Sequence, residues 1–421
     1  MGKFGTRRVL LDINRTLVIA LPLIGAQLLQ MANGFVDTLV AGRLGTTELG
    51  AGGIGAGIWF FTSLMCIGVM AGLSPILSRL IGQRRRAAVG AVFRQGLWLG
   101  VITGTIALSA ALLLVASVPG WSVQAEMVPH IRAYLLGACW SLPAFAVVMV
   151  CRNVCEATAL TRPVLLVQFV GLLVNLFGDL ALGLGWFGFP RLGLFGIGIS
   201  TSCVMLTMAL CLLWILKKRQ RFARFTLFAQ FDRPKWQEIK PMLQLSVPIY
   251  LGLVFEAGLF FVTAIQMGII GTLEAAAHNI AIGIAAACYM LPLGLSFAVT
   301  ARIGRVFGRE SLPAIRLRII SAVCITLAMS VTTATLLVIF RHRLPGIYTD
   351  DTQLIALAAH LLVFAAVFQL SDALQVILIG ILRGLQDTRV PMLINLVSYW
   401  TIAFGIGYYS AHHLGYRASG V

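Results

Sequence analysis

Long apolar stretches recur from one end of this sequence to the other, and they restrict the fold more than any other feature. Each holds about 20 residues, enough to cross the hydrocarbon core of a bilayer as an α-helix. Only 11% of the 421 residues are charged and 59% are hydrophobic, whereas soluble proteins carry about a quarter charged residues. The first stretch is too long for the core of a signal peptide, so we expect it to be retained. The pattern predicts an all-α polytopic membrane protein.

An internal repeat is the second constraint. Residues 22–82 match residues 248–308 without a gap. The distance along the sequence is the same for every matched pair, for example from Pro22 to Pro248, and is called the repeat shift below. The matched pairs are Pro22 and Pro248, Gly42 and Gly268, Gly45 and Gly271, Thr46 and Thr272, Glu48 and Glu274, Gly57 and Gly283, Gly68 and Gly294, Arg79 and Arg305, and Gly82 and Gly308. Agreement of proline, glycine and charge in one register indicates a duplicated scaffold rather than a chance likeness of apolar segments.

Turn residues and charges divide the sequence into expected helices. In the first half they cover about 16–41, 49–81, 95–117, 130–157, 164–186 and 193–216. In the second half they cover about 242–271, 276–308, 315–340, 353–383 and 390–411. We predict an N-terminal lobe (1–216), a cytoplasmic linker (217–240) and a C-terminal lobe (241–421). The repeat would place a twelfth helix at about 419–442, past Val421, so the twelfth helix is expected to be missing.

The positions of Lys and Arg predict the orientation. The net charge of +17 lies mainly in short loops between apolar stretches, which is typical of membrane proteins rather than of nucleic-acid-binding proteins. If the N-terminus is cytoplasmic, the loops after every second helix are cytoplasmic and hold most of the basic residues. The loop with Arg341 and Arg343 is the exception. With six helices per repeat, both halves insert in the same direction and form parallel repeats, a known transporter architecture.

Four acidic residues stand inside apolar helical sequence: Asp37, Asp179, Glu256 and Asp372. A charge at the bilayer centre costs about 2.5–3.5 kcal/mol or more, so such residues usually face a cavity and mark ion or proton routes. The alternative is that they pair with Arg or cap neighbouring helices. That structural reading is preferred for Glu156, because Arg152 lies one turn before it.

Polar neighbours of the first two acids favour a shared site. Gln30, Asn33 and Asp37 are spaced i, i+3 and i+7, so they form one stripe on an apolar helix. Asn175 and Asp179 are spaced i, i+4 and face the same way. Hard cations prefer such oxygen clusters, and Asp37, Asn175 and Asp179 are therefore expected to share one sodium ion or one proton.

The second half carries a different set. Gln369, Asp372 and Gln375 form another stripe, and Glu256 stands between Phe255 and the pair Phe260-Phe261. A carboxyl among aromatic rings in a low dielectric favours its neutral form, so Glu256 is a candidate to take up and release a proton. At the repeat shift Asp37 corresponds to Thr263 and Glu256 to Gln30. The acids are not duplicated with the scaffold, which predicts different tasks for the two lobes.

Catalytic and cofactor motifs are missing from the sequence. It contains no HExxH or GxSxG motif and no cluster of His and Asp, which argues against a membrane-embedded enzyme. Seven of the eight cysteines lie in apolar helical sequence, and no His or carboxylate completes a metal set around Cys151 and Cys155. We expect no cofactor, and Na⁺ or H⁺ as the coupling ion.

Several motifs together resemble the multidrug and toxin extrusion (MATE) family, in particular its NorM-like bacterial branch. They are Pro22, Asp37, Gly42 and Glu48 in the first helix region, SPILSRLIGQRRR at the end of the second helix, and Glu256 with Asp372 in FQLSDALQVILIGILRG. The resemblance covers nearly the whole chain. It implies six plus six helices around a central cavity, and an antiporter that exports organic cations in exchange for Na⁺ or H⁺.

The resemblance also assigns residues. Asp37 matches the family's first-helix acid, Asn175 and Asp179 match a pair that joins it in a cation site, and Thr201 is a weaker match to a further ligand. Glu256 and Asp372 match acids of the C-terminal lobe, and Tyr289 matches an aromatic residue near them. NorM-like proteins often have Tyr at the position of Phe368, so a hydroxyl contact is lost here.

Together these observations predict a cation-coupled drug antiporter of the bacterial inner membrane, a monomer with its N-terminus in the cytoplasm. Its partners would be small cationic amphiphiles and the lipid bilayer, without nucleic acid. The expected coupling residues are Asp37, Asn175, Asp179, Thr201, Glu256 and Asp372, with Na⁺ bound either at Asp37, Asn175 and Asp179 or at Glu256 and Asp372. The expected substrate-cavity residues are Gln30, Tyr289, Phe368 and Gln369. The alternative is a lipid-linked oligosaccharide flippase, which would favour cationic rather than acidic residues in its cavity.

Overall fold

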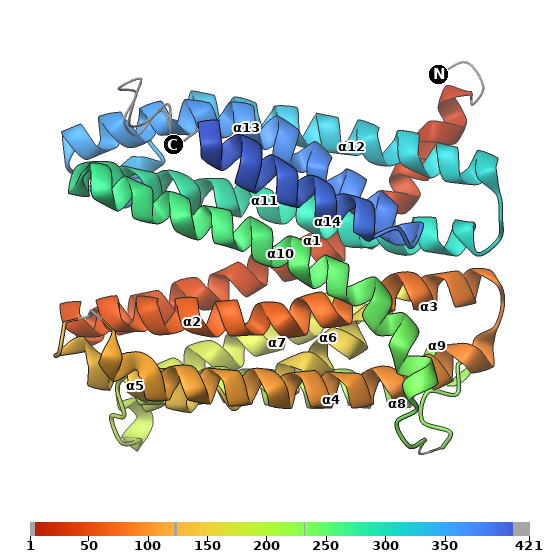
Figure 1. Cartoon of the computed structure of the whole chain (residues 1–421), viewed down its shortest axis with the longest axis horizontal. Helices are drawn as coiled ribbons and strands as arrows, with labels where there is room; N and C mark the ends of the chain where they lie inside the picture. Colours follow the sequence, from red (N-terminus) through yellow and green to blue (C-terminus); the bar gives the residue numbers. More distant parts are fainter. Residues whose placement is uncertain (1–4, 122–123, 231, 407–421) are drawn as a thin grey trace. The chain divides into compact units, whose positions relative to one another are not determined.

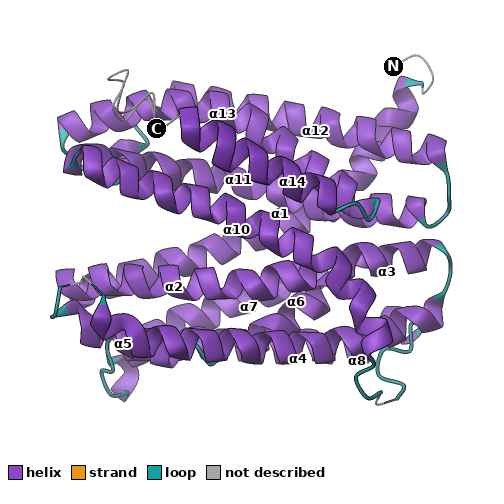
Figure 2. Cartoon of the chain, viewed as in Figure 1, coloured by secondary structure: helices purple, strands orange, loops and turns teal. Residues whose placement is uncertain are grey.

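The computed structural model describes residues 5–121, 124–230 and 232–406. Over these residues the secondary structure is helical throughout, with loops and turns between the helices and no strand (Figure 2). Ten of the described helices are long and apolar enough to cross a membrane, or eleven if the bent pair Met127–Ala138 and Ser141–Ala157 is one span. This confirms the prediction of an all-α polytopic membrane protein.

The chain forms two compact units, and each begins with part of a long helix. Unit 1 holds residues 1–24 and 251–421, and unit 2 holds residues 25–250. Helix α1 (Thr6–Leu44) and helix α10 (Trp236–Ile270) each contribute to both units (Figure 1). The division of the chain into lobes at the polar connection, 217–240, stays a prediction, because the compact units divide inside these two helices.

Unit 2 contains the helices between α1 and α10. They are α2 (Thr46–Ala71), α3 (Leu73–Gly82), α4 (Arg86–Ser117), α5 (Met127–Ala138), α6 (Ser141–Ala157), α7 (Arg162–Gly178), α8 (Leu194–Lys218) and α9 (Gln220–Ala223). Three short segments accompany them: the 3₁₀ turns η1 (Val118–Gly120) and η3 (Trp186–Gly188), and the π-helix η2 (Asp179–Gly183). Helix α8 packs against α5, α6 and α7, so it lies at the centre of this unit.

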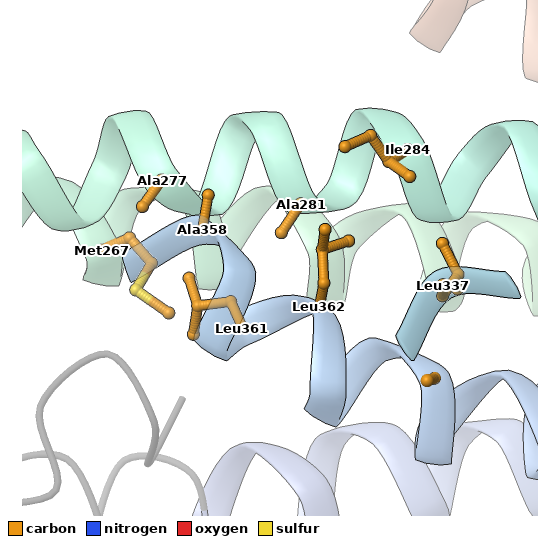
Figure 3. Packing of buried hydrophobic residues seen from close by; sticks show 9 residues of the cluster. Met267, Ala277, Ala281, Ile284, Leu337, Ala358, Leu361 and Leu362 are labelled. Atoms are coloured by element: carbon orange, nitrogen blue, oxygen red, sulfur yellow. The ribbon is translucent and has the colours of Figure 1, made fainter. Parts of the chain in front are cut away.

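Unit 1 contains the remaining helices. They are α11 (Thr272–Phe307), α12 (Leu312–Ile339), the 3₁₀ turn η4 (Pro345–Ile347), α13 (Thr352–Gly384), α14 (Arg389–Leu396) and the π-helix η5 (Val397–Ala403). Helices α11, α12 and α13 pack against one another. Small side chains at their contacts, including Ala277, Ala281 and Ala358, bring the helices close, and Met267 and Leu362 fill the space between them (Figure 3). Dense packing of this kind replaces the hydrophobic driving force that is missing between helices in lipid.

The repeat found in the sequence reappears in the unit boundaries. The boundaries follow Ile24 and Tyr250, which are separated by the repeat shift and lie shortly after Pro22 and Pro248. Proline removes one backbone hydrogen bond of a helix and favours a bend there. Each unit therefore includes the first part of the helix that continues into the other unit.

A pair of glycines explains part of the repeated sequence. A Cβ atom on Gly68 would lie 2.6 Å from Cα of Tyr250, and a Cβ atom on Gly294 would lie 2.7 Å from Cα of Ile24. The repeat shift relates Gly68 to Gly294 and Ile24 to Tyr250. No residue larger than glycine fits at such a distance from a neighbouring backbone. The two glycines are thus needed for the same helix contact, made once in each unit.

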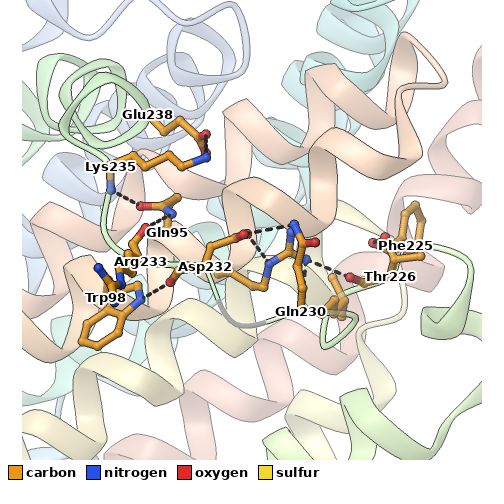
Figure 4. Close-up of polar contacts among 11 residues, drawn as sticks. Gln95, Trp98, Phe225, Thr226, Gln230, Asp232, Arg233, Lys235 and Glu238 are labelled. Carbon is orange, nitrogen blue, oxygen red and sulfur yellow. Dashed lines mark hydrogen bonds and ion pairs between the residues drawn. The ribbon is translucent and has the colours of Figure 1, made fainter.

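The polar connection between the halves is packed against unit 2 rather than free. Arg94 of α4 forms an ion pair with Asp232 at 2.6 Å, and Trp98 Nε1 donates to the backbone carbonyl of Asp232 at 2.8 Å. The side chain of Gln95 donates to the Arg233 carbonyl and accepts from the Lys235 backbone, both at 2.9 Å (Figure 4). These contacts fix the path by which the chain enters α10.

Several predicted helix boundaries differ from the structure. The first helix begins at Thr6 rather than near 16, and the predicted helix 49–81 is divided at Gly72 into α2 and α3. The predicted helix 130–157 is broken between α5 and α6, whose axes differ by 45°. The end predicted for the eleventh helix, at 411, lies outside the described residues, as do the residues up to Val421 that bear on the predicted twelfth helix.

Candidate functional site

In unit 2, the structure brings together three polar residues that the sequence predicted to share a site. Asp37 lies on α1, Asn175 lies near the end of α7, and Asp179 is the first residue of η2. The Asn175 amide nitrogen donates to Oδ1 of Asp37 at 2.8 Å and approaches Oδ2 of Asp179 at 3.4 Å. Asn175 is 2% exposed and Asp179 is fully buried. One neutral amide therefore joins two carboxyl groups from different helices.

The two carboxyl groups lie close together, because the same Asn175 amide nitrogen approaches an oxygen of each. Oδ1 of Asn175 and Oδ1 of Asp179 are buried and have no hydrogen-bond partner. The site therefore offers free oxygen atoms that could bind a proton or a hard cation.

The end of α7 is unusual at this point. The helix passes from α-helical to π-helical geometry at Asp179, where the Leu184 backbone donates to the Asp179 carbonyl at 3.3 Å. Single π-helical turns occur frequently at functional sites, because they displace side chains from the regular helical register. A second π-helix, η5, follows α14 in unit 1, so the two corresponding helices of the repeat share this irregularity.

Two hydroxyl residues of α8 lie near the acid pair. Thr201 is buried, and its hydroxyl donates to the carbonyl of Ile197 at 3.2 Å, so its assignment as a ligand stays a prediction. Ser200, one residue earlier, donates to the Asn175 carbonyl at 3.3 Å. Ser200 was not identified from the sequence, where its one signal was its position next to Thr201.

A polar stripe on α1 leads to the acid pair. Gln30 is half-buried, and Asn33 has a buried side-chain oxygen without a partner. Gln27, one turn before Gln30, is 6% exposed and also has an unpartnered oxygen. The predicted stripe of Gln30, Asn33 and Asp37 thus extends a further turn, which keeps polar atoms along the same face of α1.

In unit 1, Glu256 of α10, Tyr289 of α11 and Asp372 of α13 form the second group. The Tyr289 hydroxyl donates to Oε1 of Glu256 at 3.5 Å. Asp372 is 7% exposed, and its electrostatic interaction with Glu256 places the two acids in the same part of unit 1. Arg383 also lies within electrostatic range of Glu256. That the two acids form one coupling site stays a prediction.

A hydrogen-bond network from η5 and α14 surrounds this group. Gln375 donates from its amide to Oδ1 of Asn395 at 3.4 Å and to the Tyr399 hydroxyl. The indole nitrogen of Trp400 donates to the Phe255 carbonyl at 3.2 Å, next to Glu256. Asn395 was not identified from the sequence, because a single Asn in an apolar helix has no partner within its own helix.

The aromatic neighbours of Glu256 differ from those expected. Phe260 and Phe261 are exposed, and the aromatic side chain that contacts the carboxyl is that of Tyr289 on another helix. Of the two residues before Asp372 that were assigned to the substrate cavity, Gln369 is 2% exposed with an unpartnered amide nitrogen, whereas Phe368 is 47% exposed. The two side chains therefore lie on different faces of α13.

Glu156 has the structural role that the sequence favoured. Arg152 Nε lies 2.8 Å from Oε1 of Glu156, one turn apart on α6, and both residues are buried. Among the described residues no group of three or more His, Cys, Asp or Glu side chains is placed to hold a metal ion. A cation at either acid group would therefore have to use amide, hydroxyl or carbonyl oxygens in addition to carboxylates.

The geometry agrees with comparisons to known proteins. The model of the MatE family matches residues 22–180 and 248–409, and these two matches begin at Pro22 and Pro248, one repeat shift apart. The chain is 37% identical to the probable multidrug resistance protein NorM of Xanthomonas axonopodis pv. citri, over 94% of this chain and 86% of that protein. It is 32% identical to the multidrug resistance protein MdtK of Yersinia pseudotuberculosis, over 96% of this chain and 88% of that protein.

Solved structures show the same fold. The eukaryotic MATE transporter AtDTX14 superposes with a TM-score of 0.90 at 15% identity, covering 98% of this chain and 92% of that one. The Vibrio cholerae MATE transporter VcmN in the bent form superposes with a TM-score of 0.84 at 17% identity, covering 99% and 93%. The doubled family match and the curated relatives together show that this chain belongs to the MatE family and is related to its NorM-like members.

Proposed function

We propose that this protein is a secondary active antiporter that exports organic cations in exchange for Na⁺ or H⁺. The observation that carries the proposal is the buried group of Asp37, Asn175 and Asp179, in which two carboxyl groups from different helices meet at one amide and free oxygens remain. Intramembrane carboxyl groups of this kind mark ion and proton routes. The names of the NorM and MdtK relatives supply the multidrug resistance context.

The proposed cycle is a competition for carboxylates. A proton or Na⁺ neutralises an acid group and favours one arrangement of the helices, and an organic cation that needs a carboxylate favours the other. A ligand shifts such an equilibrium only by the difference between its affinities for the two states. Carboxyl groups that can exchange a proton for a cation would give each ligand a different affinity for the two states. The acids of unit 1, Glu256 and Asp372, would take part by the same chemistry.

The remaining features of the proposal concern cargo and location. The two acid groups together hold four carboxyl groups, those of Asp37, Asp179, Glu256 and Asp372, so the favoured cargo is small, cationic and amphiphilic. The flippase alternative is not favoured, because the deep charges of both groups are acidic and none of the relatives reported above is named as a flippase. We place the protein in the bacterial inner membrane with its N-terminus in the cytoplasm, on the distribution of Lys and Arg.

The test is transport into everted membrane vesicles. Asp37→Asn and Asp372→Asn each remove an ionisable carboxyl while keeping its size, and we expect gradient-driven movement of a cationic dye to fall at least about tenfold. Asp350→Asn, at an exposed loop position, is the matched control and should transport as the wild type does. Imposing Na⁺ and pH gradients separately identifies the coupling ion. Wild-type rates in both acid variants would refute the proposal.

A further inference from the structure

A cluster of arginines in unit 1 lies away from both acid groups. Arg302, Arg305 and Arg309 are spaced i, i+3 and i+7, so they line one face at the end of α11. Arg318 of α12 joins them through Asp12 of α1, which pairs with both Arg302 and Arg318. One acid therefore pairs with two basic side chains.

Asp12 satisfies Arg302 and Arg318 but not Arg305. Arg302 donates to Oδ1 of Asp12 at 2.7 Å, to its backbone carbonyl at 3.0 Å and to the Thr16 hydroxyl, and Arg318 contacts Oδ1 of Asp12. Nε and one terminal nitrogen of Arg305 are buried and have no hydrogen-bond partner. Arg302 and Arg309, one turn before and one turn after Arg305 on the same helix face, carry charges of the same sign.

One member of the cluster belongs to the repeat, because Arg305 corresponds to Arg79 of unit 2 at the repeat shift. In unit 1 the nearby acid, Asp12, is taken by Arg302 and Arg318. A buried guanidinium whose N–H donors have no partner is costly unless an anion binds to it.

We propose that Arg305, with Arg302 and Arg309 one turn away on the same helix face, binds a phosphate group, carried by an anionic phospholipid or present as free inorganic phosphate. A guanidinium presents parallel N–H donors that match two phosphate oxygens. Arg305 lies in the last turn of a membrane helix, and Arg309, one turn further, is exposed, so the arginines extend to the surface at the end of the helix. Basic pockets between membrane helices on the predicted cytoplasmic side are suited to anionic headgroups.

This phosphate site is independent of the proposed transport cycle, so it is tested by binding alone. Purified full-length protein in phosphatidylcholine-containing detergent micelles is titrated with phosphatidylglycerol, and bound lipid is counted by native mass spectrometry. We expect Arg305→Gln to weaken phosphatidylglycerol binding by roughly tenfold or more, because two charge-assisted hydrogen bonds are lost. Arg86→Gln removes the same charge at an exposed position of α4 and should bind as the wild type does.

Further variants and a competition experiment with inorganic phosphate complete the test. Arg305→Lys keeps the charge but loses the planar fork, and we expect it to bind between the wild type and Arg305→Gln. If Arg305→Gln does not fold, Arg309→Gln at the exposed rim serves instead, with a smaller expected loss. Millimolar inorganic phosphate that stabilises the wild type and displaces the lipid identifies free phosphate as the ligand, and no displacement identifies the lipid. Wild-type affinity in the folded Arg305 and Arg309 variants, or no preference for phosphatidylglycerol over phosphatidylcholine, would overturn the proposal.

Discussion

Asn175 shows how one neutral side chain can organise two acids. An amide carries two N–H donors and no charge, so it can serve Asp37 and Asp179 together without fixing the number of protons that they hold. A lysine or arginine in its place would keep both acids ionised, and a third carboxyl would add repulsion. The residue type therefore suits a site that must change its protonation state.

Replacing this amide should impair transport more than folding. In Asn175→Ala the two carboxyl groups lose their common donor, which costs about 1–3 kcal/mol in a buried setting, and we expect dye efflux to fall roughly tenfold or more. Efflux from intact cells, normalised to the amount of protein in the membrane, measures this. Leu173→Ala, at an exposed position of the same helix, is the control. Equal efflux from the two variants would remove Asn175 from the mechanism.

At the scale of helices, the repeat specifies backbone contacts rather than side chains of the acid groups. Gly68 lies against Tyr250, and Gly294 lies against Ile24, with backbone atoms in contact range in both pairs. The same shift relates Pro22 to Pro248, where α1 and α10 pass from one unit to the other. The repeated glycines make close helix contacts in both halves, whereas the acids stand at different positions of the repeat.

The glycine contacts predict a paired loss of stability. In Gly294→Ala the new methyl group would lie 2.7 Å from the backbone of Ile24, and in Gly68→Ala it would lie 2.6 Å from that of Tyr250. Backbone cannot move as a flexible side chain does, so we expect each variant to lose about 1–3 kcal/mol of stability, measured as a lower Tm in detergent. Gly57→Ala places its methyl group in open space and should unfold at the wild-type temperature. Unchanged Tm values for both tight glycines would contradict the packing.

For the whole molecule, the charges in loops predict which ends of the helices face the cytoplasm. Arg84 lies in an exposed loop after α3, and Glu126 lies in an exposed position before α5. Basic loops are retained on the cytoplasmic side during insertion. These two loops flank α4 and must lie on opposite sides of the membrane, because α4 is long and apolar enough to span it.

Thiol labelling tests this orientation. In a background in which all eight cysteines are replaced, a membrane-impermeant maleimide applied to intact cells should label Glu126→Cys and leave Arg84→Cys unlabelled. Permeabilised cells should label both variants. The reverse pattern in intact cells would place the N-terminus outside and invert the proposed direction of transport.

Much of the architecture follows from the sequence, because it depends on local properties. The length of apolar stretches determines that the chain crosses the membrane, and repeated Pro and Gly residues reveal the duplication. The cost of a carboxyl group in an apolar helix singles out Asp37, Asp179 and Asp372 without knowledge of their partners. Spacing within one helix also predicts that Asn175 and Asp179 face the same way, as they do.

Only the tertiary structure decides what each side chain meets on another helix. The sequence could not show that Ser200 donates to the Asn175 carbonyl, or that Asn395 accepts from Gln375 beside the second acid group. It also could not show that Asp12 pairs with Arg302 and Arg318, while two buried nitrogens of Arg305 have no hydrogen-bond partner. Hydropathy and spacing describe one helix at a time, whereas these contacts depend on how helices distant in the sequence pack against one another.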